Sequence, residues 1–145
     1  MKLPLFKYTG AAGEKMVRVS EEGQSAHTLF RVLESFGGAP LHAVGLSALS
    51  LMEATLRTGR THQIRVHMQS QNCPIAGDER YGDYTANRRL KKLGLKRMFL
   101  HAHRLVLEHP ASGETLVLTA PLPEELRQML EGLRQGKGLP EKSAC

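Results

Sequence analysis

The stretch GRTHQIRVH, at residues 59–67, holds the densest group of side chains that could do chemistry on an anion. Two arginines, two histidines and a glutamine surround two apolar residues. Gly59 marks a turn, and Thr61 is the expected N-cap of the helix that follows. Helix N-termini attract anions, and Arg60, His62 and Arg65 would add positive charge. The pattern predicts a site for phosphate or another anion, although an amphipathic helix with a solvated basic face explains it equally well.

Other recognisable chemistry is scarce in this sequence. His62 and His67 are too isolated to match a Cys/His zinc spacing, as are His101 and His103, and Cys73 has no CxxC partner. The chain contains no GxxxxGK(S/T) phosphate loop, no GxGxxG fingerprint and no GxSxG elbow. We therefore expect neither a metal nor a cofactor.

Carboxylates that could act as nucleophiles are also few. The chain has only two aspartates, Asp78 and Asp83, and both stand in the glycine-flanked stretch PIAGDERYGD. Aspartates in such loops usually turn or cap the backbone. We therefore predict a structural role for Asp78, together with a buried Tyr81.

Length and composition indicate one ordinary domain with a basic surface. The 145 residues include 41% hydrophobic and 23% charged residues, which is typical of a globular domain. Only 5% are aromatic and none is tryptophan, which argues against a sheet that binds RNA by aromatic stacking. The net charge of +6 favours a polyanionic partner, with a merely basic soluble protein as the alternative.

The sequence predicts a cytosolic protein. Cys73 and Cys145 do not form a disulfide framework, so a reducing compartment is favoured. The N-terminus lacks the apolar core of a signal peptide, and no stretch reaches the roughly 18 apolar residues of a membrane span.

Alternation, glycines and prolines predict the elements that must position the motif. The expected strands lie at about residues 16–19, 27–36, 43–56, 104–108 and 115–119. The expected helices lie at about residues 61–71, within 88–97, and from Pro123 to Gly136. The last helix is the clearest, because its leucines and methionine recur at helical spacing.

These elements predict an α+β fold with a mixed, mostly antiparallel sheet and packed helices. We expect an irregular N-terminal segment over residues 1–14, a folded body over 15–136 and a flexible tail over 137–145.

Four blocks of sequence carry a resemblance to a known family. They read, in order, GRTHQIRVHM, PIAGDERYGD, FLHAHRLVLEHPASGE and APLPEEL, and the resemblance covers about residues 47–135. In order and spacing they resemble the RluA-type pseudouridine synthases, especially the RluC type that acts on large-subunit ribosomal RNA. The resemblance implies the C-terminal half of that catalytic domain, with no cofactor and no metal.

The resemblance also implies a reaction that this chain does not perform alone. Family members cleave the glycosidic bond of a flipped-out uridine, rotate the uracil and rejoin it through carbon. Their nucleophile is an aspartate in a block resembling HRLDxxTSG, which this chain does not contain. We expect an isolated chain without activity, whose partners are ribosomal RNA and the missing N-terminal half. A non-catalytic RNA-binding module on the same scaffold is the alternative.

Site residues follow from the resemblance position by position. Arg65 matches the arginine that pairs with the catalytic aspartate, whose carboxylate a guanidinium would keep ionised. Ile64 and Leu100 match apolar positions at the base pocket, and Arg60 and His62 would face the RNA backbone. The competing interpretations are a surface ion pair for Arg65 and ordinary core packing for Ile64 and Leu100.

Two further expectations concern the surface. The basic segment Arg88–Arg97 either contacts RNA phosphates or is a solvated insertion, and the sequence favours neither. A sheet that lacks its other half would end at an open edge. We therefore expect an exposed apolar patch near Ile64 and Leu100, or a homodimer formed through it.

Overall fold

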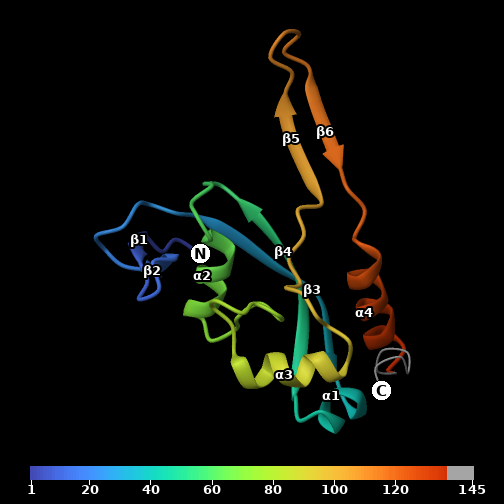
Figure 1. The fold of residues 1–145 in the computed structure, drawn as a ribbon. Coiled ribbons are helices and arrows are strands. Elements are labelled where there is room, and N and C mark those ends of the chain that lie inside the picture. The colour runs from blue at the N-terminus through green and yellow to red at the C-terminus, as the bar shows by residue number, and fades with distance from the viewer. Residues whose placement is uncertain (137–145) are drawn as a thin grey trace.

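The computed structural model describes residues 1–136, which adopt an α+β fold (Figure 1). The strands are β1 (Leu5–Thr9), β2 (Lys15–Val19), β3 (Thr28–Gly37), β4 (Ala48–Leu56), β5 (Arg104–Glu108) and β6 (Thr115–Thr119). The helices are α1 (Ala39–Ala43), α2 (Gln63–Ser70), α3 (Tyr84–Lys92) and α4 (Glu124–Arg134). The strands pair as β1–β2, β3–β4 and β5–β6, each antiparallel. The predicted α+β class is thus confirmed, with three two-stranded sheets in the described part.

The N-terminal segment is where the prediction was wrong. Residues 1–14 are not irregular, because they contain β1, which pairs with β2 and sets Leu5 opposite Val19. Only Leu5 of this strand is buried, so its alternation is too weak to be read from the sequence. Leu5 packs with Val17, Ala26, Val66 and Tyr81 in the smaller of two cores. A domain boundary at residue 14 would therefore cut a hairpin.

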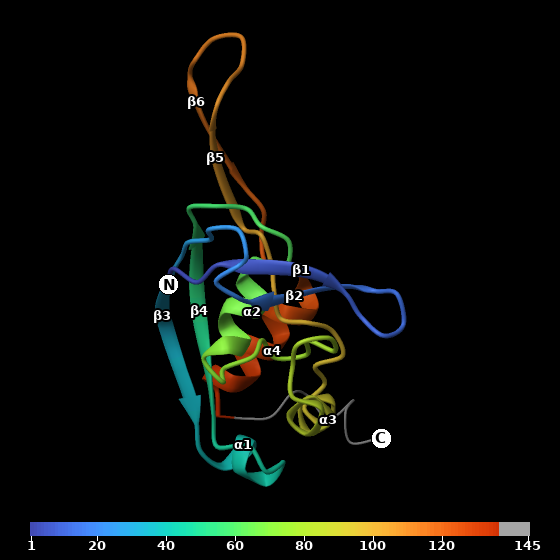
Figure 2. The ribbon, with the colours of Figure 1, turned by 90° about the vertical axis from the view of Figure 1, so that its left-hand side faces the viewer.

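A long ribbon of β3 and β4 runs through the molecule (Figures 1 and 2). Its register sets Thr28 opposite Leu56 and shifts between Val32 and Glu34, where a bulge occurs. The strand predicted for residues 43–56 begins only at Ala48, because the chain first forms the short helix α1 with a proline in its first turn. Helix α2 packs on β2 and β3, so the ribbon carries the motif.

The larger core joins α1, α3 and α4. Its buried members are Leu41, Leu90, Leu93, Leu95, Leu126 and Met129. Helix α4 confirms the predicted apolar stripe and begins with two glutamates, which suit its positive end. The tail predicted for residues 137–145 lies outside the described residues.

Strands β5 and β6 form an arm that extends away from the rest of the molecule (Figures 1 and 2). The predicted hairpin is confirmed. Four of its apolar side chains are half exposed or more, namely Leu105, Val106, Val117 and Leu118. Among residues 1–136, no helix combines the length and apolar character that crossing a membrane requires.

Candidate functional site

The turn that leads into helix α2 is held by a side chain that the sequence did not single out. Thr61 is not the N-cap as predicted: that position is His62, whose φ of 54° is left-handed and whose side chain caps nothing. The turn is held instead by Gln63, whose Oε1 accepts hydrogen bonds from Arg60 N at 2.9 Å and Thr58 Oγ1 at 2.8 Å. A residue within the helix therefore fixes the loop that leads into it.

The same glutamine starts a buried chain of hydrogen bonds. Gln63 Nε2 donates to His27 O at 3.0 Å and to Thr28 Oγ1 at 2.9 Å. Thr28 Oγ1 bonds His67 Nδ1 at 2.8 Å, and His67 Nε2 bonds Leu3 O at 2.9 Å. A carbonyl oxygen can only accept, so Nε2 donates and Nδ1 accepts from Thr28. This chain fixes α2 against β3 and the N-terminal segment.

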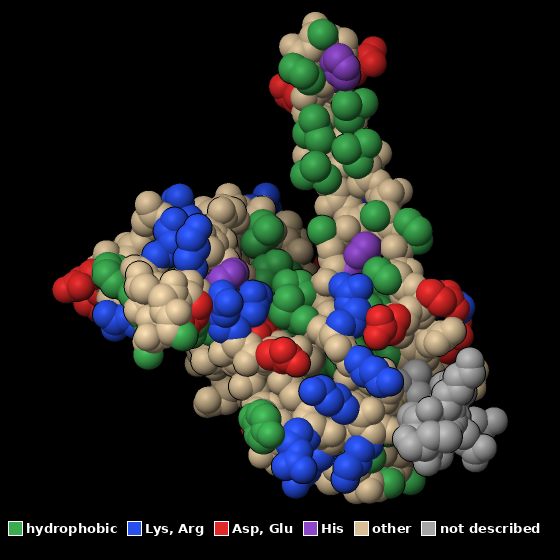
Figure 3. Space-filling view, in the orientation of Figure 1, with side chains coloured by type: hydrophobic (Ala, Val, Ile, Leu, Met, Phe, Trp, Pro, Cys, Tyr) green, Lys and Arg blue, Asp and Glu red, His purple; other side chains and the backbone are tan. Residues whose placement is uncertain are grey.

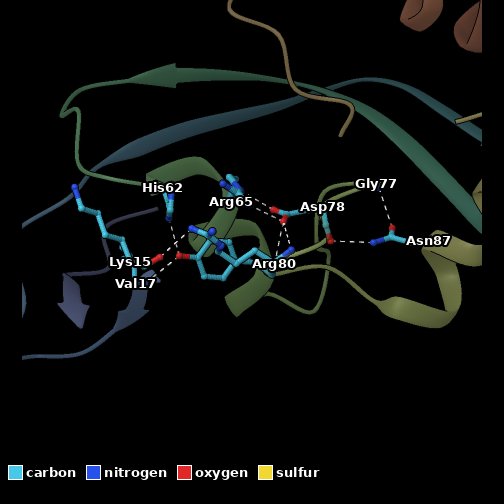
Figure 4. Close-up of polar contacts among 9 residues, drawn as sticks. Lys15, Val17, His62, Arg65, Gly77, Asp78, Arg80 and Asn87 are labelled. Carbon is cyan, nitrogen blue, oxygen red and sulfur yellow. Dashed lines mark hydrogen bonds and ion pairs between the residues drawn. The ribbon is translucent and has the colours of Figure 1, made fainter. Parts of the chain in front are cut away.

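Arg65, on α2, forms a bidentate ion pair with Asp78 (Figure 4). Its Nε donates to Asp78 Oδ2 and its Nη2 to Oδ1, each at 2.8 Å. Asp78 is 1% exposed, and its Oδ1 also accepts from the backbone N–H groups of Arg80 and Tyr81 at 3.0 Å. Asp78 thus gives Arg65 a carboxylate partner that the sequence did not predict, whereas the pairing of Arg65 with a catalytic aspartate outside this chain stays a prediction. The predicted turn-forming role of Asp78 is confirmed.

The environment keeps this pair charged. Burial alone would raise the pKa of the Asp78 carboxyl, but the Arg65 hydrogen bonds and the two backbone N–H groups hold it below 3.8. Hydrogen bonding to Asp78 in turn raises the pKa of Arg65. Arg65 Nη1 takes no part in the bidentate pair. The guanidinium is thus held in place with donor capacity still available.

The side chain of His62 is hydrogen-bonded to Tyr81. Its Nδ1 lies 2.7 Å from the Tyr81 hydroxyl, which also accepts from Val17 N at 3.0 Å. Burial, and then the charges of Arg65 and Arg80, lower the pKa of His62. The Arg65 guanidinium lies over the Tyr81 ring, 4.9 Å from its centroid. Tyr81 thus orients both basic side chains.

A pocket of about 290 Å³ opens beside this cluster. It is lined by His62, Gln63, Ile64, Arg65, Met98 and Leu100. The structure therefore brings Ile64 and Leu100 together with Arg65 and His62, although they come from segments far apart in the chain. Arg60 is not among the lining residues, and its Nε donates to Ser25 O at 2.9 Å. Hydrophobic side chains line the hollow at the foot of the arm (Figure 3).

A second pocket, of about 400 Å³, adjoins the first. It shares Arg65 and Met98 with it, and its other lining residues are Gly77, Asp78, Glu79, Arg80, Lys96 and Arg97. Two loops run side by side here: the first carries Ala76 and Asp78, and the second carries Met98 and Phe99. Phe99 N donates to Ala76 O at 2.8 Å and joins them. Asn87 of α3 holds the first loop by accepting from Gly77 N and donating to Asp78 O, both at 2.9 Å (Figure 4).

Several residues of this site escaped prediction from sequence. Gln63 is polar and 3% exposed, so no hydrophobic pattern marks it. Met98 lies in a loop and Asn87 is a polar residue on α3, so only their neighbours in space give them a role. Within the described part of the chain, no three His, Cys, Asp or Glu side chains are close enough to hold a metal ion.

Comparison with known proteins gives a consistent result. The model of the RNA pseudouridylate synthase family matches residues 6–70. The chain is 43% identical over 137 residues to ribosomal large subunit pseudouridine synthase C of Haemophilus ducreyi. It is 41% identical over 139 residues to the enzyme of that name from Escherichia coli. Each match covers 94% of this chain, which spans about 40% of the length of these curated relatives.

Solved structures agree with the sequence comparisons. Human RNA pseudouridylate synthase domain containing 4 superposes with a TM-score of 0.61 at 32% identity, over 92% of this chain and 55% of that one. Human RNA pseudouridylate synthase domain containing 1 gives 0.63 at 23% identity, over 94% and 59%, and so shows the fold alone. Over most of its length, this chain is therefore similar to members of the RNA pseudouridylate synthase family.

Proposed function

We propose that this chain is part of an enzyme that isomerises uridine to pseudouridine in large-subunit ribosomal RNA, in the cytoplasm. The names of the bacterial relatives support the reaction and the target. The observation that carries the proposal is the position of Arg65, which is held by Asp78 at the edge of a pocket lined by Ile64 and Leu100. An isomerisation leaves the composition of the nucleotide unchanged, so no group has to be supplied or carried away.

Such a site has to hold a uracil ring and orient a catalytic carboxylate, and the geometry fits both tasks. Ile64, Met98 and Leu100 offer nonpolar walls to a flat uracil ring taken out of its stack. Arg65 Nη1 remains for a second carboxylate, which the guanidinium would keep ionised and oriented. His62 would lie at the rim of the same pocket, close to the sugar and phosphate of the bound nucleotide.

The nucleophilic carboxylate, in this proposal, comes from a segment outside this chain. Asp78 is buried and already paired with Arg65, so it is poorly placed to attack a sugar. Asp83 caps α3, where its Oδ1 accepts from Ala86 N at 2.8 Å. The exposed apolar side chains of β3 and the arm would then be covered by the remaining portion of the synthase. A second copy of this chain is the competing occupant of that face.

The test is release of tritium from RNA that carries 5-tritiated uridine, combined with RNA binding. We expect this chain alone to bind RNA in a salt-sensitive manner and to release no tritium. Release by the chain alone would contradict an external nucleophile. A non-catalytic RNA-binding module is favoured instead if adding the remaining portion of the enzyme from a relative never produces activity while binding persists.

A further inference from the structure

We propose that the second pocket binds an RNA phosphate next to the nucleotide whose base enters the first pocket, with Lys96 and Arg97 as its principal ligands. This inference rests on the proposed function and adds a separate binding site to it. The two pockets are defined by different residues and meet only at Arg65 and Met98. A base and its phosphates are separated by one sugar, so adjoining apolar and cationic pockets match the chemistry of a nucleotide.

The charges in the second pocket leave an excess of cations. Four of its lining residues are basic and two are acidic. Asp78 is neutralised by Arg65, and Glu79 lies 3.9 Å from Lys91 on α3. Arg80, Lys96 and Arg97 therefore face the pocket without an equal number of unpaired carboxylates. Such a group of charges is suited to a phosphodiester.

One short segment serves both pockets. Lys96 and Arg97 line the cationic pocket, Leu100 lines the apolar pocket, and Met98 belongs to both. Gly77 allows this segment to approach, since a Cβ on Gly77 would lie 2.3 Å from Arg97 O. The segment is thus packed against the loop that carries Asp78. The backbone that carries Lys96 and Arg97 therefore lies next to the apolar walls.

This geometry divides the basic segment Arg88–Arg97 into two parts. The residues on α3 line neither pocket: Arg88 lies over the Tyr84 ring and Arg89 Nη1 donates to Gly45 O at 2.6 Å. Only Lys96 and Arg97, which follow the helix, reach the site. RNA contact is therefore assigned to the end of the segment, while α3 serves mainly the fold.

The first experiment measures binding of the full chain to a fluorescent oligouridylate by anisotropy at several salt concentrations. The double variant Lys96→Ala/Arg97→Ala should bind about 10-fold more weakly at low salt, and the slope of log Kd against log salt should fall by about 1–2. The matched control is Arg88→Ala/Lys92→Ala, which removes the same charge from α3 and should change Kd less than about 2-fold. Equal losses from both pairs, or no loss from the first, would overturn the proposal.

The second experiment separates the phosphate site from the base pocket. NMR titrations of the full chain compare uridine with its 5′- and 3′-monophosphates. At least one monophosphate should bind about 3- to 10-fold more tightly than uridine, and Lys96→Ala/Arg97→Ala should abolish that gap while leaving uridine binding unchanged. Uridine binding without any gain from phosphate would overturn this inference alone. Failure to bind uridine at the signals of Ile64 and Leu100 would contradict the proposed function and this inference with it.

Discussion

Arg65 can serve two carboxylates because a guanidinium carries five N–H donors in a fixed plane. Asp78 uses Nε and Nη2, and so sets the plane of the guanidinium without exhausting it. The backbone N–H groups that also bind Asp78 keep that carboxylate from rotating. Asp78 is thus a positioning residue for the side chain that would meet the catalytic aspartate.

Replacing Asp78 with Asn should lower the free energy of unfolding by about 3 kcal/mol near neutral pH, because Arg65 would lose a buried ionic partner. The pKa of Asp78 is lowered in the folded state, so its contribution is present above 3.8 and is lost as the pH falls through the lowered value. The gap between the parent chain and the variant should therefore shrink in acid. Urea unfolding at about pH 7 and about pH 3 measures it.

Asp83→Asn is the control for that experiment. Asp83 is exposed and only caps α3, and Asn is also a good N-cap, so unfolding should change by less than about 0.5 kcal/mol. A gap for Asp78→Asn that stays constant down to acid pH would show that the carboxylate charge does not stabilise the fold.

Thr28→Val should destabilise the chain by about 1–3 kcal/mol, since it leaves His67 Nδ1 without a donor and removes an acceptor from Gln63. Thr55→Val, at an exposed position on the neighbouring strand, is the matched control and should be nearly neutral. Chemical denaturation compares the two. Equal stability of both variants would contradict a structural role for the buried network.

At the level of elements, the sequence predicts best where periodicity is strong. Helix α4 and both strands of the arm lie where their alternating or helical patterns place them. Strand β1 was missed because only one of its side chains is buried. The start of α2 was misplaced because Gln63, and not a threonine cap, organises the turn.

The candidate site could be predicted from the sequence only in part. The motif and the family resemblance identified Ile64, Arg65, His62 and Leu100, which the fold brings to one pocket. The pairing of Arg65 with Asp78 was not foreseen, because it depends on how a loop folds back on α2. Local sequence does not encode that approach.

Gly77→Ala should lower the free energy of unfolding far more than a comparable glycine substitution elsewhere. Gly77 has a φ of 80° and its Cβ would lie 2.3 Å from Arg97 O, so both backbone strain and a clash arise. Gly113 has a φ of 71° with nothing within 4 Å, so Gly113→Ala isolates the strain, about 1 kcal/mol. Unfolding free energies should differ by more than about 1 kcal/mol between the two variants. Equal losses would mean that the two loops are not in close contact.

The described part of the molecule combines a packed body with surfaces on which apolar side chains are exposed. The body packs α1, α3 and α4 around one core, whereas the arm is a two-stranded hairpin, which is marginal on its own. Apolar side chains remain exposed on both β3 and the arm, as the green side chains along the arm in Figure 3 show. This is consistent with a chain that spans about 40% of the length of its relatives.

The double variant Leu105→Ala/Leu118→Ala should leave the free energy of unfolding within about 1 kcal/mol of the parent, because both side chains are exposed across from one another on the arm. Leu126→Ala, at a fully buried position on α4, should cost about 2–5 kcal/mol. Chemical denaturation compares the free energies of unfolding of the two variants. A large loss of stability from the arm variant would mean that the arm belongs to the core.

We propose that this chain supplies the Arg65 side of a pseudouridine synthase site, and that the nucleophile comes from a segment outside this chain. The most direct test replaces the matching part of the Escherichia coli enzyme with this chain and measures tritium release from 5-tritiated uridine RNA. We expect no release by this chain alone, release by the chimera, and a loss of at least about 100-fold in the chimera with Arg65→Ala. Release by the chain alone, or an Arg65→Ala chimera as active as its parent, would contradict this proposal.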